Sequence, residues 1–261
     1  IGILVIYTSS KELAFQQLMF TVIGTIIFFL VSRFELQSIK NLINPLYIFV
    51  LLTLVAVLVL GFETRGTLRW IPLGIFNIQP SEFAKPVLIL LLAKFWSERS
   101  PDWPSILKSL FWLAPYFILV FKQPDLGSSL TLIAIWLGML FAARISVKKM
   151  ILLVLIAAAV IPLSWLFLHG YQRERILSFM APEADPLGKG YNLIQSTIAV
   201  GSGELLGRGL GMGTQSRLQF LPEFRTDFIF AFIAEEMGFV GSVLILLLYL
   251  FLLIYCLKAA Q

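Results

Sequence analysis

Charged side chains are scarce in this sequence and gather at a few places where they could bind or act on a polar substrate. Of the 261 residues, 13% are charged. Glu82 and Lys85, in the segment QPSEFAKP, are three residues apart and share one helix face. Opposite charges in an apolar segment must be paired or line a polar cavity. Two interpretations stay open: a structural ion pair at a helix start, or a pair bordering a cavity where Lys85 neutralises an anionic substrate.

Asp125 lies in the segment KQPDLG, directly after a proline and before a long apolar run. This position is typical of a helix N-cap, where a carboxylate accepts backbone N–H groups. The alternative is a carboxylate that faces the same outer cavity as Glu82.

The densest polar stretch covers residues 170–227. It contains Arg173 and Arg175, then Asp185 as the only carboxylate in a turn of proline and glycine, then six glycines within residues 201–213. Glycines let backbone N–H groups approach a ligand, and arginines offer planar donors to phosphate. The run fits no nucleotide-binding fingerprint. A structured functional loop is the interpretation favoured here, and a flexible solvated loop is the alternative.

Several other chemistries are excluded by residue counts. The sequence has one histidine, His169, and one cysteine, Cys256, so a His/Cys zinc site cannot be built and no internal disulfide can form. Glu235 and Glu236 are adjacent acids inside an apolar segment. Carboxylates at that depth are expected to face protein or water rather than lipid.

The elements that must position these groups are apolar helices. Hydrophobic residues make up 59% of the chain, which excludes disorder and an ordinary soluble domain. Uncharged runs over residues 13–32, 41–62, 126–143, 150–172 and 237–257 are each long enough to cross about 30 Å of hydrocarbon. Hydrophobic segments can be drawn at residues 2–7, 13–32, 45–62, 81–96, 107–121, 126–143, 150–169 and 228–257. The sequence predicts an all-α, polytopic membrane bundle of about eight spans.

The basic residues are expected to mark topology rather than a nucleic-acid surface, although the net charge is +5. One side of the predicted bundle holds Arg33, Lys40, Lys94, Arg99, Lys108, Arg144, Lys148, Lys149 and Lys258. The short loops of the other side hold only Lys11, Arg65, Arg69 and Lys122. The larger set is expected in the cytoplasm, which places residues 170–227 outside.

Several segments together resemble one known family. QPSEFAKP, KQPDLGSSL and the stretch from DPLGKGYNLIQ through LPEFRTDFIFAFIAEEMGFVG are similar to the SEDS family (shape, elongation, division and sporulation). The segment GTQSRLQFLPE resembles the rod-shape branch more than the division branch. Arg225 departs from the histidine common in the family at this place and keeps a cation there.

The resemblance implies a peptidoglycan glycosyltransferase of the bacterial cytoplasmic membrane. Such enzymes polymerise lipid II on the outer face into β-1,4 glycan and release undecaprenyl pyrophosphate. It implies a single membrane domain over residues 1–261, with the active site in the outer loop 170–227. This chain would contain about eight of the family's ten spans, without the start of the first and without the last two. The expected partners are lipid II, membrane lipid, a class B penicillin-binding protein and other elongation-complex proteins, and no nucleic acid.

The resemblance also assigns roles. Asp185 matches the family's essential loop aspartate and is expected to act as general base, with its pKa raised by partial desolvation. The candidates for binding substrate are Lys85, Glu82, Asp125, Arg173, Arg175, Arg208, Arg217, Gln195 and Ser196. No metal site is predicted. A divalent cation such as Mg²⁺ or Mn²⁺ could share the neutralisation of pyrophosphate, with Asp125 or Glu82 helping to hold it.

Three alternatives stay open at this point. Buried charges in a bundle would also suit a flippase for lipid II or another polyprenyl-linked sugar. The chain could be a division-type family member. It could also be a non-catalytic scaffold that positions a cell-wall synthase.

Overall fold

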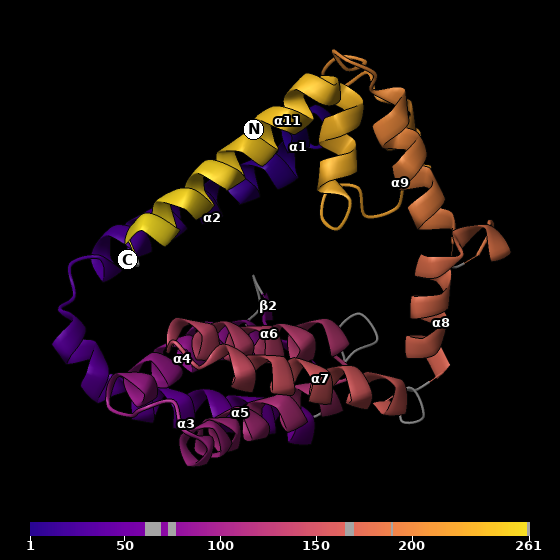
Figure 1. Ribbon diagram of the computed structural model, residues 1–261. Helices are drawn as coiled ribbons and strands as arrows, with labels where there is room; N and C mark the ends of the chain where they lie inside the picture. Colours follow the sequence, from indigo (N-terminus) through magenta and orange to yellow (C-terminus); the bar gives the residue numbers. More distant parts are fainter. Residues whose placement is uncertain (61–68, 73–76, 165–169, 189, 260–261) are drawn as a thin grey trace. The chain divides into compact units, whose positions relative to one another are not determined.

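The computed structural model describes residues 1–60, 69–72, 77–164, 170–188 and 190–259, with the side chains of residues 36, 38, 161–164, 171 and 175 left undescribed. This part is helical apart from connections and one antiparallel pair of two-residue strands (Figure 1). The elements are α1 (Gly2–Ser9), α2 (Lys11–Val31), α3 (Leu36–Leu60), β1 (Ile71–Pro72), β2 (Asn77–Ile78), α4 (Pro80–Ser97), α5 (Trp103–Lys122), α6 (Leu126–Ala142), α7 (Val147–Ser164), α8 (Gly170–Met180), η2 (Pro182–Ala184), α9 (Tyr191–Ser202), α10 (Thr214–Arg217) and α11 (Ile229–Ala259).

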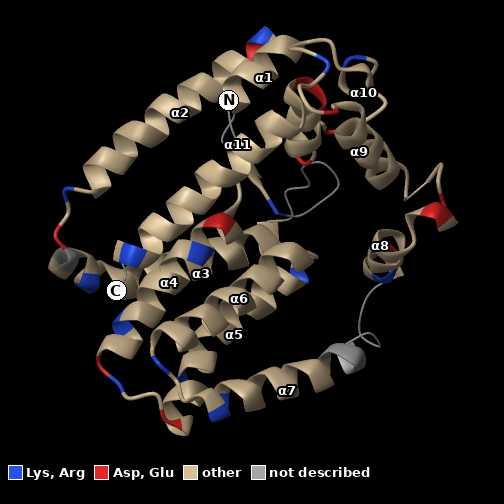
Figure 2. Cartoon of the chain, turned by 45° about the horizontal axis from the view of Figure 1, so that its top comes forward, with Lys and Arg blue, Asp and Glu red and all other residues tan. Residues whose placement is uncertain are grey.

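The predicted class, an all-α multi-pass membrane protein, is confirmed. Four helices in the described part are long and apolar enough to cross a membrane: Lys11–Val31, Ile39–Leu60, Trp103–Lys122 and Ile229–Ala259. Charged residues gather near helix ends and connections, and the body of α2 has none (Figure 2). The other predicted spans coincide at least in part with α1, α4, α6 and α7, and their crossing of the membrane stays a prediction.

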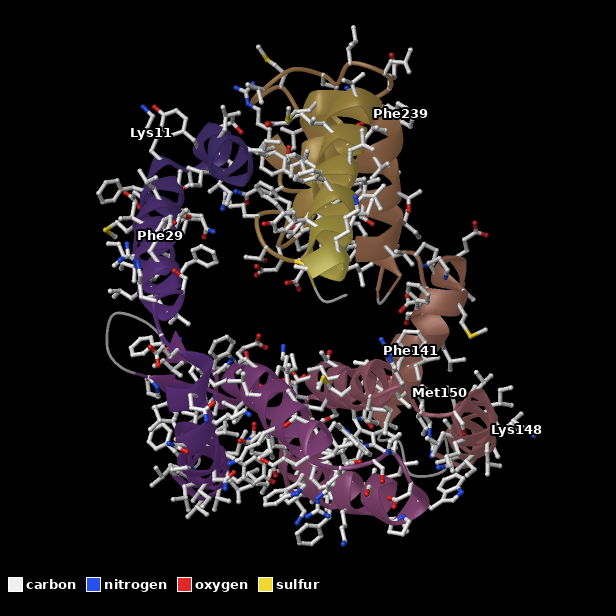
Figure 3. All side chains as sticks on the ribbon, turned by 60° about the vertical axis from the view of Figure 1, so that its left-hand side comes forward. Lys11, Phe29, Phe141, Lys148, Met150 and Phe239 are labelled. Atoms are coloured by element: carbon white, nitrogen blue, oxygen red, sulfur yellow. The ribbon has the colours of Figure 1, made fainter. Side chains whose placement is uncertain are left out.

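The long helices leave large apolar side chains uncovered. Phe29 on α2, Phe141 on α6 and Phe239 on α11 are 62%, 76% and 62% exposed (Figure 3). Exposed apolar surface of this extent is what a hydrocarbon surrounding requires.

The chain divides into two compact units. The central unit covers Arg33–Phe167, and the terminal unit combines Ile1–Ser32 with Leu168–Gln261. Each unit has its own cluster of buried apolar residues.

The core of the central unit is tied together by polar side chains that reach backbone carbonyls of neighbouring helices. Tyr47 on α3 and Tyr116 on α5 stack with ring centroids 4.5 Å apart. The Tyr116 hydroxyl donates to the Tyr47 carbonyl (3.0 Å), and the buried Gln123 donates to the Leu54 carbonyl (3.0 Å). Because water cannot satisfy buried carbonyls, such bonds fix α3 against α5 more strongly than apolar packing alone.

The terminal unit is organised around a break in α11. Gly238 adopts φ 67° and ψ −162°, a conformation that residues other than glycine rarely adopt. Before the break, residues 231–236 are all buried; after it, most side chains of the helix are exposed. The buried part packs against α9 and α1.

Candidate functional site

Asp185 lies in a turn that two glycines permit. The turn follows η2, and the Asp185 carbonyl accepts hydrogen bonds from the N–H groups of Gly188 (3.3 Å) and Gly190 (3.1 Å). A Cβ atom at Gly188 would overlap the Asp185 carboxylate, and one at Gly190 would overlap the Pro182 carbonyl. The glycines therefore leave the carboxylate a defined place on the turn.

The Asp185 side chain borders a cavity of about 440 Å³ that it shares with Glu174 and Ser178 of α8. Asp185 itself is exposed, so the desolvation predicted for it is not provided by the described residues. Glu174 stands between Arg173 and Arg175, and the residue pattern gives no sign that it shares a cavity with Asp185. Two carboxylates at one cavity suit proton transfer, in which one side chain can accept a proton that the substrate gives up.

The predicted arginines whose side chains are described have different surroundings. Arg173 is half-buried on α8, and the side chain of Arg175 lies outside the described part. Arg208 is exposed, and its Nε donates to the Ser202 carbonyl (3.1 Å). Arg217 borders a different cavity of about 360 Å³ together with Arg225.

The two polar residues proposed on α9 differ in their surroundings. Ser196 is buried, donates to the Leu193 carbonyl (2.8 Å) and borders a third cavity, of about 480 Å³. Gln195 is half-buried. Ser196 is thus partly engaged in its own helix, as a hydroxyl inside a helix commonly is.

The glycine-rich run and the helix α10 that follows it are held against α11 by two buried glutamates. Glu235 accepts the N–H groups of Gln215 (2.7 Å) and Ser216 (3.2 Å), which are the first turn of α10. Glu236 accepts the N–H of Gly211 (2.7 Å) and the hydroxyl of Thr8 on α1 (3.1 Å). The prediction that these acids face protein or water is confirmed, because they face protein.

The backbone of the run also pairs with the broken turn of α11. The N–H groups of Arg208 and Gly209 donate to the carbonyls of Glu235 (2.9 Å) and Glu236 (3.0 Å). A Cβ atom at Gly207 would overlap the Glu236 carbonyl. The glycines here serve close packing of backbone on backbone, and the flexible-loop alternative does not describe this segment.

In the central unit, Glu82 and Lys85 form the ion pair that their spacing predicts. The Lys85 Nζ lies 2.7 Å from Glu82 Oε1, and the two side chains are 24% and 55% exposed. The described contacts are those of a surface pair at the start of α4. Substrate contact by either residue stays a prediction.

Asp125 is a buried helix cap. Its carboxylate accepts the N–H (3.1 Å) and the hydroxyl (2.9 Å) of Ser128, and Gln79 donates to it from the start of α4 (3.0 Å). Arg69 lies 4.0 Å from it and also donates to the Gln123 carbonyl (2.9 Å). The N-cap interpretation is confirmed, and contact of Asp125 with substrate stays a prediction.

The described residues do not converge as metal ligands: no group of three His, Cys, Asp or Glu side chains in this part could hold an ion. His169 lies outside the described residues. The carboxylates of Asp125 and Glu82, which were predicted to help hold a divalent cation, accept protein donors instead.

Comparison with known proteins gives this geometry its context. The family model FTSW_RODA_SPOVE, described as "Cell cycle protein", matches residues 3–261. Peptidoglycan glycosyltransferase MrdB of Escherichia coli (strain K12) is 46% identical over 212 residues, which are 80% of this chain and 57% of that protein. Stage V sporulation protein E of Bacillus subtilis (strain 168) is 36% identical and matches 97% of this chain and 73% of that protein.

Two solved structures share the fold. One, described as "Structural coordination of polymerization and crosslinking by a peptidoglycan synthase complex", gives a TM-score of 0.79 at 29% identity over 97% of this chain and 72% of that one. The Thermus thermophilus rod shape determining protein RodA gives 0.66 at 24% identity, over 97% and 68%. The chain spans 57% of the length of MrdB, so it corresponds to part of that relative. It belongs to the FtsW/RodA/SpoVE family of cell cycle proteins, as its motifs predict.

Proposed function

We propose that this chain belongs to a peptidoglycan glycosyltransferase that polymerises lipid II, with Asp185 as general base. The observation that carries the proposal is the Asp185 turn, in which glycines hold an exposed carboxylate beside a cavity. The glycosyltransferase name of MrdB, at 46% identity, supports the same reaction.

The reaction assigned to the site is an inverting displacement. The acceptor sugar's 4-hydroxyl attacks the anomeric carbon of the donor, and its proton passes to the Asp185 carboxylate. The new O–C bond forms as the bond from the anomeric carbon to the lipid pyrophosphate breaks. General-base assistance of this kind contributes about 10²–10⁴-fold to the rate.

The leaving pyrophosphate needs cations more than a protonating acid, because it already departs well as an anion. We assign this neutralisation to Lys85, Arg173, Arg175, Arg208 and Arg217. Gln195 and Ser196 are assigned to binding the sugar or its amide groups, and Glu82 to holding Lys85, which it contacts at 2.7 Å. In this arrangement the protein lies in the bacterial cytoplasmic membrane with residues 170–227 outside.

A partner follows from the same reasoning. The solved structure with a TM-score of 0.79 is that of a peptidoglycan synthase complex, and its description names polymerization and crosslinking. We propose that this protein likewise works beside a crosslinking enzyme, of the class B penicillin-binding type. Other elongation-complex proteins are proposed as further partners.

The test compares lipid II polymerisation by the full-length protein and its partner, with the partner's transpeptidase blocked. Asp185→Asn is expected to reduce glycan synthesis by about 10²–10⁴-fold. Glu183→Gln is the matched control: Glu183 is exposed on η2, two residues before Asp185, and its change should leave synthesis unaltered.

Near-normal synthesis by a stably expressed Asp185→Asn protein would remove Asp185 from the mechanism. If the intact wild-type complex makes no strands, polymerisation is the wrong activity. Lipid II movement across vesicles would then be measured to separate a flippase from a scaffold.

A further inference from the structure

A further polar cavity lies in the central unit, and none of its lining residues is assigned to the reaction. Its volume is about 360 Å³, and it opens where α3 begins, α4 ends and α5 begins. Three cations line it: Lys94 and Arg99 at the end of α4, and Lys108 on α5. Phe95, Phe111 and Trp112 are among its apolar lining residues.

The positive charge of this cavity is not neutralised by an ion pair. Among the described residues, Arg69 pairs with Asp125 and Lys85 pairs with Glu82, and neither pair includes a residue of the cavity. One carboxylate, that of Glu98, also lines the cavity. With three cations and one carboxylate, the charged lining of the cavity has a net charge of +2. An unneutralised excess in a concave site attracts an anion.

The cations retain donors for such an anion. The Lys94 ammonium donates once, to the Lys40 carbonyl (3.1 Å), and an ammonium has three donors. The Arg99 guanidinium lies over the Phe95 ring, 4.9 Å from its centroid, which leaves its edge N–H groups available. A phosphate group matches donors of this number and geometry.

The cavity is also bordered by apolar surface. Phe111 is 72% exposed and Leu107 is 65% exposed, on either side of Lys108 in the sequence. They belong to α5, one of the helices long and apolar enough to cross a membrane. A lysine one or two turns inside a span reaches with its ammonium toward the headgroup region while its stem stays in the apolar layer. A ligand for this place carries a phosphate and a hydrocarbon chain together.

We propose that the cavity binds the phosphate headgroup of an anionic phospholipid, with Lys94, Arg99 and Lys108 around the phosphate and an acyl chain along Leu107 and Phe111. Basic pockets between membrane helices recognise acidic lipid headgroups in this way. The site is independent of glycan synthesis, because none of its residues is assigned to that reaction.

The test measures lipid retention by the purified full-length protein, using native mass spectrometry after exchange between phosphatidylglycerol, cardiolipin and phosphatidylcholine. The wild-type protein is expected to retain phosphatidylglycerol and cardiolipin in preference to phosphatidylcholine. Arg99→Gln with Lys108→Gln should lower this preference about fivefold for each cation removed. The control, Arg33→Gln with Lys148→Gln, removes two exposed cations that do not line the cavity and should keep the preference (Figure 3 labels Lys148).

Equal loss of preference in the cavity variant and the control would overturn the proposal, since general surface charge would then explain the binding. A second experiment replaces the lipid with inorganic phosphate in lipid-free detergent micelles and measures whether the unfolding temperature of the protein rises. No protection is expected. Phosphate that protects as well as the lipid would overturn the apolar half of the site. Capture of a polyglutamate peptide by lipid-saturated wild type, lost in the cavity variant, would reassign the cavity to an acidic protein segment.

Discussion

Asp125 and Asp185 show how two aspartates in similar sequence settings acquire opposite characters. Each lies beside a proline and two residues or fewer before a leucine, in a segment that contains glycine. Asp125 is buried, and Gln79 and Ser128 donate to its carboxylate. Asp185 is exposed on a glycine turn beside a cavity. A buried carboxylate that accepts protein donors stabilises the fold, whereas an exposed one that borders a cavity can take a proton from a substrate.

The most severe way to break the Asp185 region without touching its carboxylate is Gly188→Ala. The added methyl group would overlap the carboxylate and force it to another place. Because displacing a catalytic group by about 1 Å can cost about 10²-fold in rate, glycan synthesis is expected to fall by that order.

Gly201→Ala on α9 is the matched control, since nothing lies within 4 Å of its Cβ position. It should leave synthesis unchanged. A Gly188→Ala protein as active as wild type would mean that the proposed reaction does not need the carboxylate where the turn places it.

Substitution of Asp125 is expected to lower the stability of the fold rather than the activity. Asp125→Ala leaves Gln79 and the Ser128 N–H without their acceptor in a buried place, a loss of about 3 kcal/mol. Asp185→Ala, at an exposed site, should cost less than about 1 kcal/mol. Thermal unfolding of both variants in one detergent measures the difference.

Asp125→Asn, which keeps one acceptor oxygen, should fall between wild type and Asp125→Ala. Equal unfolding temperatures for the two alanine variants would contradict the assignment of Asp125 as a structural cap.

The smallest expected effect on stability concerns Asp102, the exposed N-cap of α5. Asp102 accepts the N–H of Ser105 (2.9 Å) at the start of α5, and hydrogen bonds from Ser105 lower the pKa of its carboxyl below the ordinary 3.8. A depressed folded-state pKa means that the charged cap stabilises the fold above the unfolded pKa and loses this contribution as the pH falls through the folded pKa. The unfolding temperatures of wild type and Asp102→Asn should therefore converge as the pH is lowered from 7 to below the folded pKa. A gap that widens on acidification would reverse the assigned sign.

The sequence predicted those features that depend on local spacing. The Glu82–Lys85 pair follows from its three-residue offset, and the Asp125 cap follows from a proline before it and an apolar run after it. Uncharged runs predicted the long helices for the same reason, because a span is a local property of composition.

Features that depend on distant segments could not be predicted in this way. The glycines of the run predict backbone N–H groups that can approach a ligand, but the N–H groups of Arg208 and Gly209 bond to the broken turn of α11, more than twenty residues further along the chain. Glu174 was passed over because its shared cavity with Asp185 appears only once α8 and the glycine turn are folded. Such pairings are set by tertiary contacts that residue spacing does not contain.

The attachment of the glycine-rich run to α11 also has a mechanical consequence. The side chains and carbonyls of Glu235 and Glu236 accept hydrogen bonds from the run and from α10. The N–H groups of Phe239 and Val240, beyond the bend, donate to the carbonyls of Glu204 and Leu205. Because the segment 204–216 is bonded to α11 on both sides of the bend at Gly238, the segment and the helix are expected to move together. A tilt of the first turns of α11 is therefore expected to move residues 204–216 as well, and a force applied to these residues is expected to reach the helix at Gly238.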